Sequence, residues 1–518
     1  MIQYRYALPA PGSFRPEARE QAYLAWITKT QLTDENLWRH FVDVFRTKAD
    51  GIDRGWRGEY WGKMMRGACL VYRCTADEVL YAVLERAVRG LLACAESDGR
   101  ISTYPRETEC AGWDLWCRKY VLTGMLHFCD ICRDAALAET ILGAMERHLD
   151  CLLAVVGPEE GKKNITETSD FWLGVNSCSI LEPVLDLYRR RPHARFLAFA
   201  RYIVETGGCS GGNLVDLALE NKTPPYLYPE TKAYETMSFF EGVLAYYEVT
   251  GERKYLDAVL RFVNTVYQTD ITLIGCAGCT HEQFDHAAVR QTAYAKKAMQ
   301  ETCVTVTWMR LCARLFLLTG DDNYASRVEQ AALNALYGSV NRFSQPHTMP
   351  RSGEVVDALP FDSYSPLYCN RRGRGVGGLK QYDDGFFYGC CAAIGAAGLA
   401  VYPLVEALRS EQPQPYTLEE HRLNGKVAFT FGPYVLARDE EKDKKRVWSP
   451  VRPRKKDGNL CYELLPCEDG EQVRLRLKTA RGEILLTDYA SCGKHWHDSD
   501  ALMTVWMPTR ARLFRKNK

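Results

Sequence analysis

Two adjacent cysteines, Cys390 and Cys391, are the pair in this chain whose type and spacing most directly suggest chemistry. Adjacent cysteines rarely form a disulfide with each other, because the small ring strains the peptide bond. Two neighbouring thiolates can instead bind one soft metal ion, and zinc takes four ligands from cysteine, histidine and carboxylate side chains. Glu301 and Cys303 would complete such a set. The alternative is that these are buried thiols in a cysteine-rich protein.

Local structure decides whether Glu301 and Cys303 can reach one ion. Residues two apart do not share a face of an α-helix, so the pair can converge only if this stretch is not helical. The β-branched residues at 304–307 favour local extension. Cys276 and Cys279 form a Cys-x-x-Cys, a spacing used by zinc sites and by redox dithiols. No second such pair follows and no thioredoxin-like pattern surrounds it, which favours structural or incidental thiols, and the role of these two cysteines is left open.

Glu282 is a candidate general acid or base. It lies in a Gly-rich, polar segment, next to His281 and near His286. A carboxyl group in such a loop can exchange protons with a substrate. The alternative is a solvated loop residue, and the two histidines are open to the same alternative.

These residues need a scaffold, and the apolar pattern of residues 16–410 predicts long helices. A short turn followed by an apolar helix recurs along this region. The copies are Thr75–Asp77, Thr250–Glu252 and Thr319–Asp321, with looser ones at Cys132–Asp134 and Arg191–His193. Such a repeat is typical of one helical hairpin per unit, and about six units correspond to an (α/α)6 barrel. A solenoid of helix pairs is the alternative, since a period alone does not show closure.

After residue 410 the pattern changes. A Pro-containing break at 411–415 is followed by runs of period two at 426–431, 472–477 and 502–506, which predict half-buried strands. We therefore expect a mainly α protein with two domains. Residues 1–410 would form the (α/α)6-barrel catalytic domain, and residues 411–518 a short β-sandwich-like domain.

Composition excludes several classes of protein. The chain of 518 residues has 66 basic and 65 acidic residues, a net charge of +1. Its overall electrostatic field therefore does not favour binding to nucleic acid or to an anionic membrane. The sequence has no 18-residue apolar run that predicts a membrane span. The first residues do not resemble a secretory signal. The 20 cysteines are therefore expected to be reduced thiols of a cytoplasmic protein.

Taken together, the motifs resemble glycoside hydrolase family 127, the β-L-arabinofuranosidases and their relatives. The family pattern has a Gly-rich loop ending in a His and Glu, then Glu-Thr-Cys, then a distant Cys-Cys. Here these are Thr280–Glu282, Glu301–Cys303 and Cys390–Cys391. Further similar segments are Gly58–Lys63, Asp98–Tyr104, Trp113–Trp116, Ser179–Pro183 and Gly432–Leu436. The β-rich region is shorter than is usual in the family.

The resemblance implies a mechanism. Glu301, Cys303, Cys390 and Cys391 would hold Zn²⁺, with Cys390 as nucleophile and Glu282 as acid/base. The reaction would be glycoside hydrolysis with retention of configuration, through a thioglycosyl intermediate. The substrate would be an oligosaccharide or glycoside, and a homodimer is left open.

Candidate sugar contacts follow from the same resemblance. Aromatic faces and imidazoles of these segments are expected to line the sugar, and the set is Tyr60, Trp61, Trp113, Trp116, His281 and His286. Characterised arabinofuranosidases carry Gly-His dipeptides at two positions where this chain reads Arg118-Lys119 and Thr231-Lys232. Lys119 and Lys232 are therefore expected to contact a different sugar, one that carries an acidic group. Two alternatives stay open: a carbohydrate-binding, non-hydrolytic relative with structural zinc, and a sugar epimerase or lyase on the same barrel.

Overall fold

The computed structural model describes most of the chain. The described residues are 2–272, 274–278, 282–290, 299–342, 346–348, 355–366, 378–409, 416–423, 426–431, 434–442, 445–468, 471–491 and 503–506. Helices dominate up to residue 406, and strands dominate from residue 418 onward. His281 and Cys279 lie outside the described residues.

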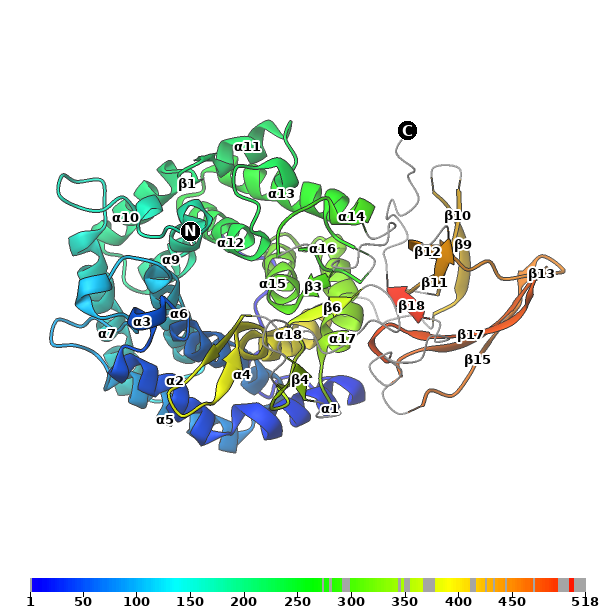
Figure 1. Cartoon of the computed structure of the whole chain (residues 1–518), viewed down its shortest axis with the longest axis horizontal. Helices are drawn as coiled ribbons and strands as arrows, with labels where there is room; N and C mark the ends of the chain where they lie inside the picture. Colours follow the sequence, from blue (N-terminus) through cyan, green and yellow to red (C-terminus); the bar gives the residue numbers. More distant parts are fainter. Residues whose placement is uncertain are drawn as a thin grey trace.

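Within these residues, a ring of inner helices surrounds a central axis (Figure 1). Its members are α4 (Gly58–Thr75), α6 (Asp114–Cys129), α8 (Val175–Cys178) with α9 (Leu181–Arg190), α12 (Ala233–Thr250), α15 (Thr302–Thr319) and α18 (Cys390–Glu406). Each contacts the next, and α18 returns to contact α4. This closure confirms the (α/α)6 barrel and excludes the open solenoid.

An outer layer of helices packs on the ring. Its members are α1 (Ala18–Ile27), α2 (Glu35–Thr47), α5 (Glu78–Leu92), α7 (Ala135–Val155), α10 (Ala194–Glu205), α13 (Arg253–Thr269) and α16 (Asp322–Ala331). From α5 onward, each outer helix follows an inner helix in sequence and contacts it. The shorter helices α3 (Asp50–Asp53), α11 (Leu214–Glu220), α14 (Ala287–Arg290) and α17 (Tyr337–Ser339) lie in the connections.

The turns from inner to outer helices confirm the predicted repeat. Helices α4, α12 and α15 each end at a threonine, and the next residue is left-handed, with φ of 51° at Ala76, 73° at Gly251 and 74° at Gly320. Asp77 and Asp321 then cap the following helices by accepting backbone N–H groups. The repeated sequence is therefore the hairpin turn of each unit.

The ring closes tightly where α4 meets both of its neighbours. A Cβ added at Gly62 would overlap the carbonyl oxygen of Tyr120 on α6. A Cβ at Gly67 would lie 2.8 Å from the backbone nitrogen of Ala397 on α18. These two glycines let the three backbones approach each other, which brings the side chains of α4 next to those of α6 and α18.

Among the described residues, α15 is the one helix of at least 18 residues that meets the length and hydropathy expected of a membrane span. Its 18-residue window is 78% buried inside the protein. It contacts the inner helices α12 and α18 and the outer helix α16. The apolar composition of α15 is therefore explained by its place in the barrel core.

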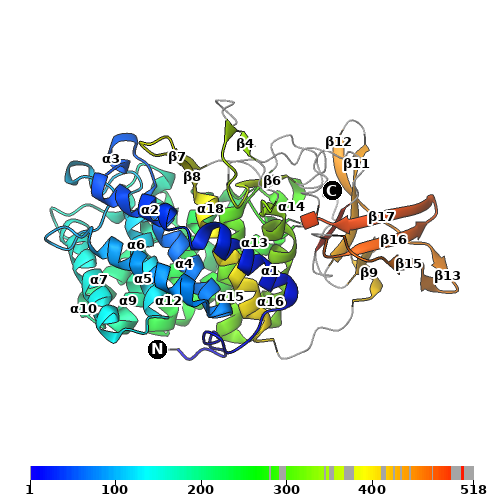
Figure 2. The same cartoon turned by 90° about the horizontal axis from the view of Figure 1, so that it is seen from below.

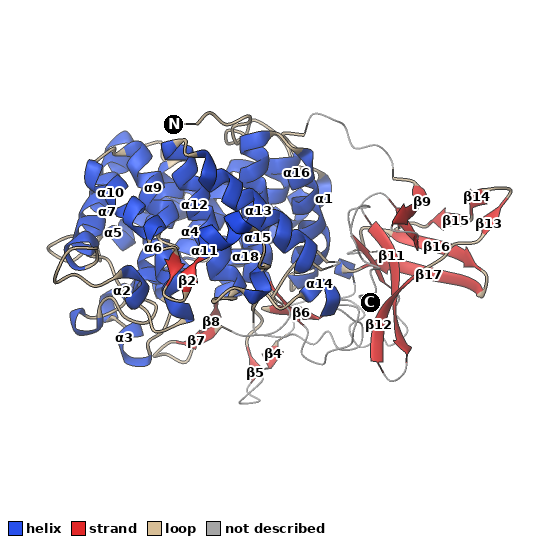
Figure 3. Cartoon of the chain, turned by 90° about the horizontal axis from the view of Figure 1, so that it is seen from above, coloured by secondary structure: helices blue, strands red, loops and turns tan. Residues whose placement is uncertain are grey.

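Short strands gather at one end of the barrel, whereas the N-terminal segment lies at the opposite end (Figures 2 and 3). They pair as β3 (Met299–Glu301) with β6 (Tyr364–Pro366), β4 (His347–Thr348) with β5 (Val355–Val356), and β7 (Leu379–Gln381) with β8 (Phe387–Gly389). A further pair is β1 (Gly208–Cys209) with β2 (Gly212–Asn213). Strands β3 and β8 lead directly into α15 and α18, so this end carries the N-termini of both helices.

The C-terminal strands form an eight-stranded sheet in the order β15-β16-β17-β18-β11-β10-β9, with β12 pairing with β11. Their bounds are β9 (Leu418–Leu423), β10 (Lys426–Phe431), β11 (Tyr434–Lys442), β12 (Lys445–Pro450), β15 (Tyr462–Leu464), β16 (Arg474–Thr479), β17 (Gly482–Asp488) and β18 (Met503–Trp506), and β13 (Lys455–Lys456) pairs separately with β14 (Asn459–Leu460). Leu475 and Leu477 alternate with exposed residues, as period two predicts. The expected strand domain is thus present, while the predicted boundary at 410/411 falls in 410–415, outside the described residues.

Candidate active site and metal centre

Three thiols and one carboxylate converge where two strands become inner helices. Glu301 ends β3 in extended conformation, and Cys303 lies in the first turn of α15. Cys390 and Cys391 begin α18 directly after β8. The prediction that Glu301 and Cys303 can converge only outside a regular helix is confirmed. The extension expected at 304–307 is wrong, because these residues are helical and the break at Glu301 suffices.

The spacing of these four side chains is compatible with a bound metal ion such as zinc. The four ligand atoms lie within 4.8 Å of one another. Cys391 Sγ is 3.4 Å from Cys303 Sγ, 3.9 Å from Cys390 Sγ and 3.6 Å from Glu301 Oε1. Zinc–sulfur bonds of about 2.3 Å place neighbouring sulfurs roughly 3.8 Å apart. Glu301 Oε2 is buried without a hydrogen-bond partner among the described residues, so it also has a lone pair free for an ion.

The three thiols differ in exposure and in the direction of their pKa shifts. Cys390 is half-buried, whereas Cys303 and Cys391 are buried. Burial raises the pKa of the Cys303 and Cys391 thiols well above the usual 9.0. Hydrogen bonds from these two thiols, with smaller contributions from nearby lysines, hold the pKa of Cys390 well below 9.0. The thiol with the lowered pKa therefore belongs to the half-buried residue of the set.

The loop that carries Glu282 is held against the start of α12. The N–H of Ala233 donates to the Glu282 carbonyl (3.0 Å), and the N–H of Phe284 donates to the Thr231 carbonyl (2.7 Å). Asp270, at the end of α13, accepts the N–H groups of residues 285 and 286 at 2.9 Å. Glu282 itself has a left-handed backbone, with φ of 66°. This pairing brings the Glu282 carboxyl to the same end of the barrel as the thiols.

Both oxygens of the Glu282 carboxylate have partners. Oε2 forms an ion pair with Lys232, and Oε1 accepts a hydrogen bond from the Tyr364 hydroxyl. Tyr364 lies opposite Glu301 in the β3–β6 register, so the acid/base candidate adjoins the metal cluster. The Lys232 ammonium also lies 4.7 Å from the centre of the Trp172 ring. With 18% of its side chain exposed, Glu282 is accessible, and its orientation is restrained.

The model of the beta-L-arabinofuranosidase GH127 catalytic domain matches residues 13–347. The chain belongs to this family. It is therefore a glycoside hydrolase, as the motifs predicted. A comparison with curated protein sequences gives no match.

Two solved structures are similar to this GH127 protein over most of its length. One is a GH127 β-arabinofuranosidase, with a TM-score of 0.52 and 16% identity, covering 92% of this chain and 68% of that one. The other is a GH127 β-L-arabinofuranosidase from Geobacillus stearothermophilus T6, with a TM-score of 0.54 and 13% identity, covering 92% of this chain and 85% of that one. At these identities the likeness concerns the fold.

Two of the aromatic residues predicted to contact sugar are packed inside this GH127 barrel. Tyr60 is fully buried, and its hydroxyl donates to the carbonyls of Gly378 and Tyr388 at 3.2 Å. Trp61 is fully buried against Trp38. Neither ring has an exposed face, so the structure does not bring them into an accessible site.

The other two aromatic residues lie closer to the opening. Trp113 is half-buried and its ring stacks at 5.5 Å on Phe171, at the end of the barrel that carries the site. Trp116 is 1% exposed, and its indole N–H donates to Glu59. Of the four, Trp113 is the residue with accessible ring surface, and its role as a sugar contact stays a prediction.

The structure places the polar residues predicted to contact sugar in different environments. Lys232 adjoins Glu282, as described above. Lys119 is buried within the ring, 4.4 Å from the centre of the Trp116 ring, and its Nζ has no hydrogen-bond partner among the described residues. The ring of His286 stacks on Tyr226 at 4.4 Å. Substrate contact therefore stays a prediction for Lys232 and His286, and the environment of Lys119 is that of a core residue.

Cys276 lies beside the cluster without joining it. It is fully buried, and its thiol donates to the carbonyls of Ala277 (3.1 Å) and Glu301 (3.3 Å). Burial raises its pKa to about 12, which suits a neutral thiol. These contacts are those of a buried structural thiol, one of the roles left open for Cys276.

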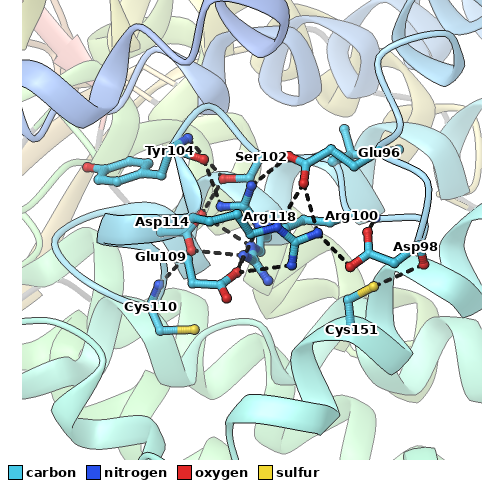
Figure 4. Close-up of polar contacts among 12 residues, drawn as sticks. Glu96, Asp98, Arg100, Ser102, Tyr104, Glu109, Cys110, Asp114, Arg118 and Cys151 are labelled. Atoms are coloured by element: carbon cyan, nitrogen blue, oxygen red, sulfur yellow. Dashed lines mark hydrogen bonds and ion pairs between the residues drawn. The ribbon is translucent and has the colours of Figure 1, made fainter.

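A buried ionic network fixes the loop before α6 (Figure 4). Arg118 pairs with Asp114 at 3.1 Å and with Glu109 at 2.9 Å, and Arg100 pairs with Glu96 at 2.7 Å. Asp114 begins α6, so the network sets where this helix starts. It thereby positions the tryptophans on either side of that start.

Sequence reasoning missed two residues that touch the site. Tyr364 contacts Glu282 because of the β3–β6 register, and no motif links residues so far apart. Lys63 donates to Glu59 at 2.9 Å and to Cys303 Sγ at 3.7 Å. The i,i+4 spacing of Glu59 and Lys63 could have predicted their ion pair, but not the contact with Cys303.

Proposed function

We propose that this GH127 protein is a retaining, β-L-arabinofuranosidase-like glycosidase, with Cys390 as nucleophile and Glu282 as acid/base. The observation that carries the proposal is the accessibility of Cys390, the half-buried member of an otherwise buried set of ligands. Glu282 supports it, since its carboxyl adjoins this set and is partly exposed. The family match supports the reaction class.

The first step breaks the glycosidic bond. Glu282 gives its proton to the leaving oxygen while Cys390 Sγ attacks the anomeric carbon, so that a C–S bond replaces the C–O bond. Tyr364 and Lys232 orient the carboxyl for this transfer. A zinc ion held by Glu301, Cys303, Cys390 and Cys391 would keep the attacking sulfur deprotonated.

The second step releases the sugar. The Glu282 carboxylate takes a proton from water, the water oxygen attacks the anomeric carbon, and Cys390 leaves as a thiolate. Two inversions at the same carbon retain its configuration. Lys232, which adjoins Glu282, is the residue we propose to contact a substituent of the sugar.

The test is a panel of aryl furanosides and pyranosides, including sugars that carry a carboxylate, assayed with metal analysis. We expect near-stoichiometric zinc and turnover on one sugar class. Cys390→Ser should lower kcat/KM by at least about 1,000-fold. Cys467→Ser is the matched control, because Cys467 is an exposed thiol far along the chain. Mass spectrometry should find the trapped sugar on the peptide that contains Cys390.

Four results would contradict the proposal. Absence of zinc from the purified protein, or full activity of Cys390→Ser, rules out this mechanism. An unsaturated or isomerised product without hydrolysis points to a lyase or an epimerase. Sugar binding by calorimetry without turnover on any glycoside of the panel points to a non-hydrolytic carbohydrate-binding protein.

A further inference from the structure

Lys63 is a fully buried lysine that touches the metal cluster, and the mechanism above gives it no role. Its ammonium donates to Glu59 Oε1 at 2.9 Å and to Cys303 Sγ at 3.7 Å. Three rings from two other inner helices surround it, with centres at 4.6 Å for Tyr234, 5.3 Å for Tyr120 and 5.9 Å for Trp116. The site is therefore an aromatic cage with one carboxylate and one sulfur.

The cage suits a positively charged side chain. The ammonium forms an ion pair with the Glu59 carboxylate at 2.9 Å, and the lysine is fully buried. Aromatic faces add attraction for a desolvated cation. An unpaired ammonium would be costly at full burial, so these contacts are what permit a cation here.

The position of the ammonium is also fixed. The second oxygen of Glu59 accepts the indole N–H of Trp116, so the carboxylate cannot turn away from Lys63. The hydroxyls of Tyr120 and Tyr234 hydrogen-bond to each other and lock two walls of the cage. The close approach of α4 and α6 at Gly62, one residue before Lys63, leaves the chain no room to shift.

A bound metal would need such a cation. Three thiolates and one carboxylate carry more negative charge than a divalent ion supplies, so the filled centre is a buried anion. Among the residues that the structure describes, Lys63 is the cation that donates a hydrogen bond to a sulfur of the cluster, whereas Lys232 forms an ion pair with Glu282. An N–H donated to Cys303 Sγ also withdraws electron density from that sulfur and leaves Cys390 as the richer nucleophile.

We propose that Lys63 is a positioning residue of the metal centre, which orients Cys303 Sγ and offsets the charge of the bound cluster through its aromatic cage. The inference rests on the metal centre of the proposed function. In other metal sites, residues that hydrogen-bond to the metal ligands orient them in the same way. Loss of such a residue typically weakens metal binding roughly 10- to 100-fold.

The experiment measures zinc affinity by competition with a chromophoric chelator, on the full-length protein without substrate. We expect Lys63→Met to weaken zinc binding roughly 10- to 100-fold. Lys119→Met is the matched control, because Lys119 is a buried ammonium on the same Trp116 and Tyr120 rings with no contact to the cluster. Its zinc affinity should stay within about twofold of that of the wild type.

A second readout separates positioning from simple destabilisation. In the cobalt-substituted protein, loss of the N–H donated to Cys303 should move the sulfur-to-cobalt charge-transfer band to longer wavelength in Lys63→Met and not in Lys119→Met. If Lys63→Met does not fold, Lys63→Gln keeps a donor in the cage without the charge, and it should still weaken zinc binding because the charge of the bound cluster is no longer offset.

The outcomes distinguish the two proposals. Unchanged zinc affinity and an unchanged cobalt band in the folded Lys63 variant would overturn the role of Lys63 and leave the mechanism intact. A wild-type protein that binds no zinc would overturn the metal centre and with it this inference. A wild-type protein that binds zinc but hydrolyses no glycoside would overturn the hydrolytic function alone.

Discussion

Two lysines on neighbouring inner helices are both buried, and they differ in their partners. Lys63 has a carboxylate and a sulfur within hydrogen-bond reach. Lys119 contacts the rings of Trp116 and Tyr120, and its Nζ has no hydrogen-bond partner among the described residues. Burial lowers the pKa of Lys119 to about 7. The direct contacts of Lys63 offset its desolvation cost, whereas the rings and the more distant charges of Glu182 and Glu241 offset that of Lys119 only in part.

Lys119→Met should stabilise the protein, by an amount that depends on pH. Below pH 7 the lysine is protonated in both states and the burial cost is full. Between about pH 7 and the unfolded pKa of 10.5, only the unfolded state holds the proton, so wild-type stability rises with pH. Urea unfolding should show the variant more stable at pH 6, on the order of a few kcal/mol, with a smaller difference at pH 9.5.

Lys63→Met is the comparison for that measurement, and it should destabilise the protein because it leaves the buried carboxylate of Glu59 unpaired. A Lys119→Met protein that is less stable than the wild type at pH 6 would contradict the sign given above.

At the scale of elements, each ligand pair belongs to a strand that runs into an inner helix. The β7–β8 hairpin leads into α18 and is held at its base, where the N–H of Cys390 donates to the Gly378 carbonyl at 3.3 Å. Gly378 is left-handed, with φ of 63°, and a Cβ there would overlap Cys390 Sγ. The hairpin therefore presses its backbone against the proposed nucleophile, which limits where that sulfur can lie.

Gly378→Ala should displace Cys390 Sγ and lower both zinc content and kcat/KM, the latter by at least about 100-fold, since small misplacements of a reacting group are costly. Gly385→Ala in the same hairpin is the matched control. It is also left-handed, with φ of 86°, but its added Cβ meets nothing within 4 Å. The control should cost about 1 kcal/mol of stability and retain activity. Equal activities for the two variants would show that the contact with sulfur is unimportant.

At the scale of the whole molecule, closure of the ring brings together ligands from distant parts of the chain. Helix α4 contacts α6 on one side and α18 on the other, through Gly62 and Gly67. The same closure places Lys63 of α4 beside Cys303 of α15. Tight packing of α4 is thus a condition both for the barrel and for the site.

Gly62→Ala should destabilise the protein by about 3 kcal/mol, because its Cβ meets a backbone carbonyl that cannot move aside. Gly143→Ala on the outer helix α7 is the matched control, since its nearest atom is the flexible end of Arg147 at 3.6 Å. This control should stabilise by about 1 kcal/mol through helix propensity alone. Thermal unfolding of the two variants checks the opposite signs, and equal shifts would contradict the role of the α4 seam.

Local patterns determined much of this protein. Apolar periodicity and the repeated turns predicted the helical hairpins, because both follow from contacts between residues near in sequence. The Glu-Thr-Cys and Cys-Cys motifs likewise predicted the four residues that the structure brings together into a group able to hold a metal ion. The β-branched residues at 304–307 misled the prediction of local structure, because burial of α15 in the core outweighs their weak preference for strands.

The tertiary structure alone decided the rest. Cys390 and Cys391 are chemically identical neighbours, and the direction of α18 exposes the first and buries the second. The partners of Glu282 and of Cys303, namely Tyr364, Lys232 and Lys63, come from elements far away in sequence. Sequence spacing sets which residues share a local element, whereas ring closure and strand register set which elements meet, and those depend on the packing of the whole chain.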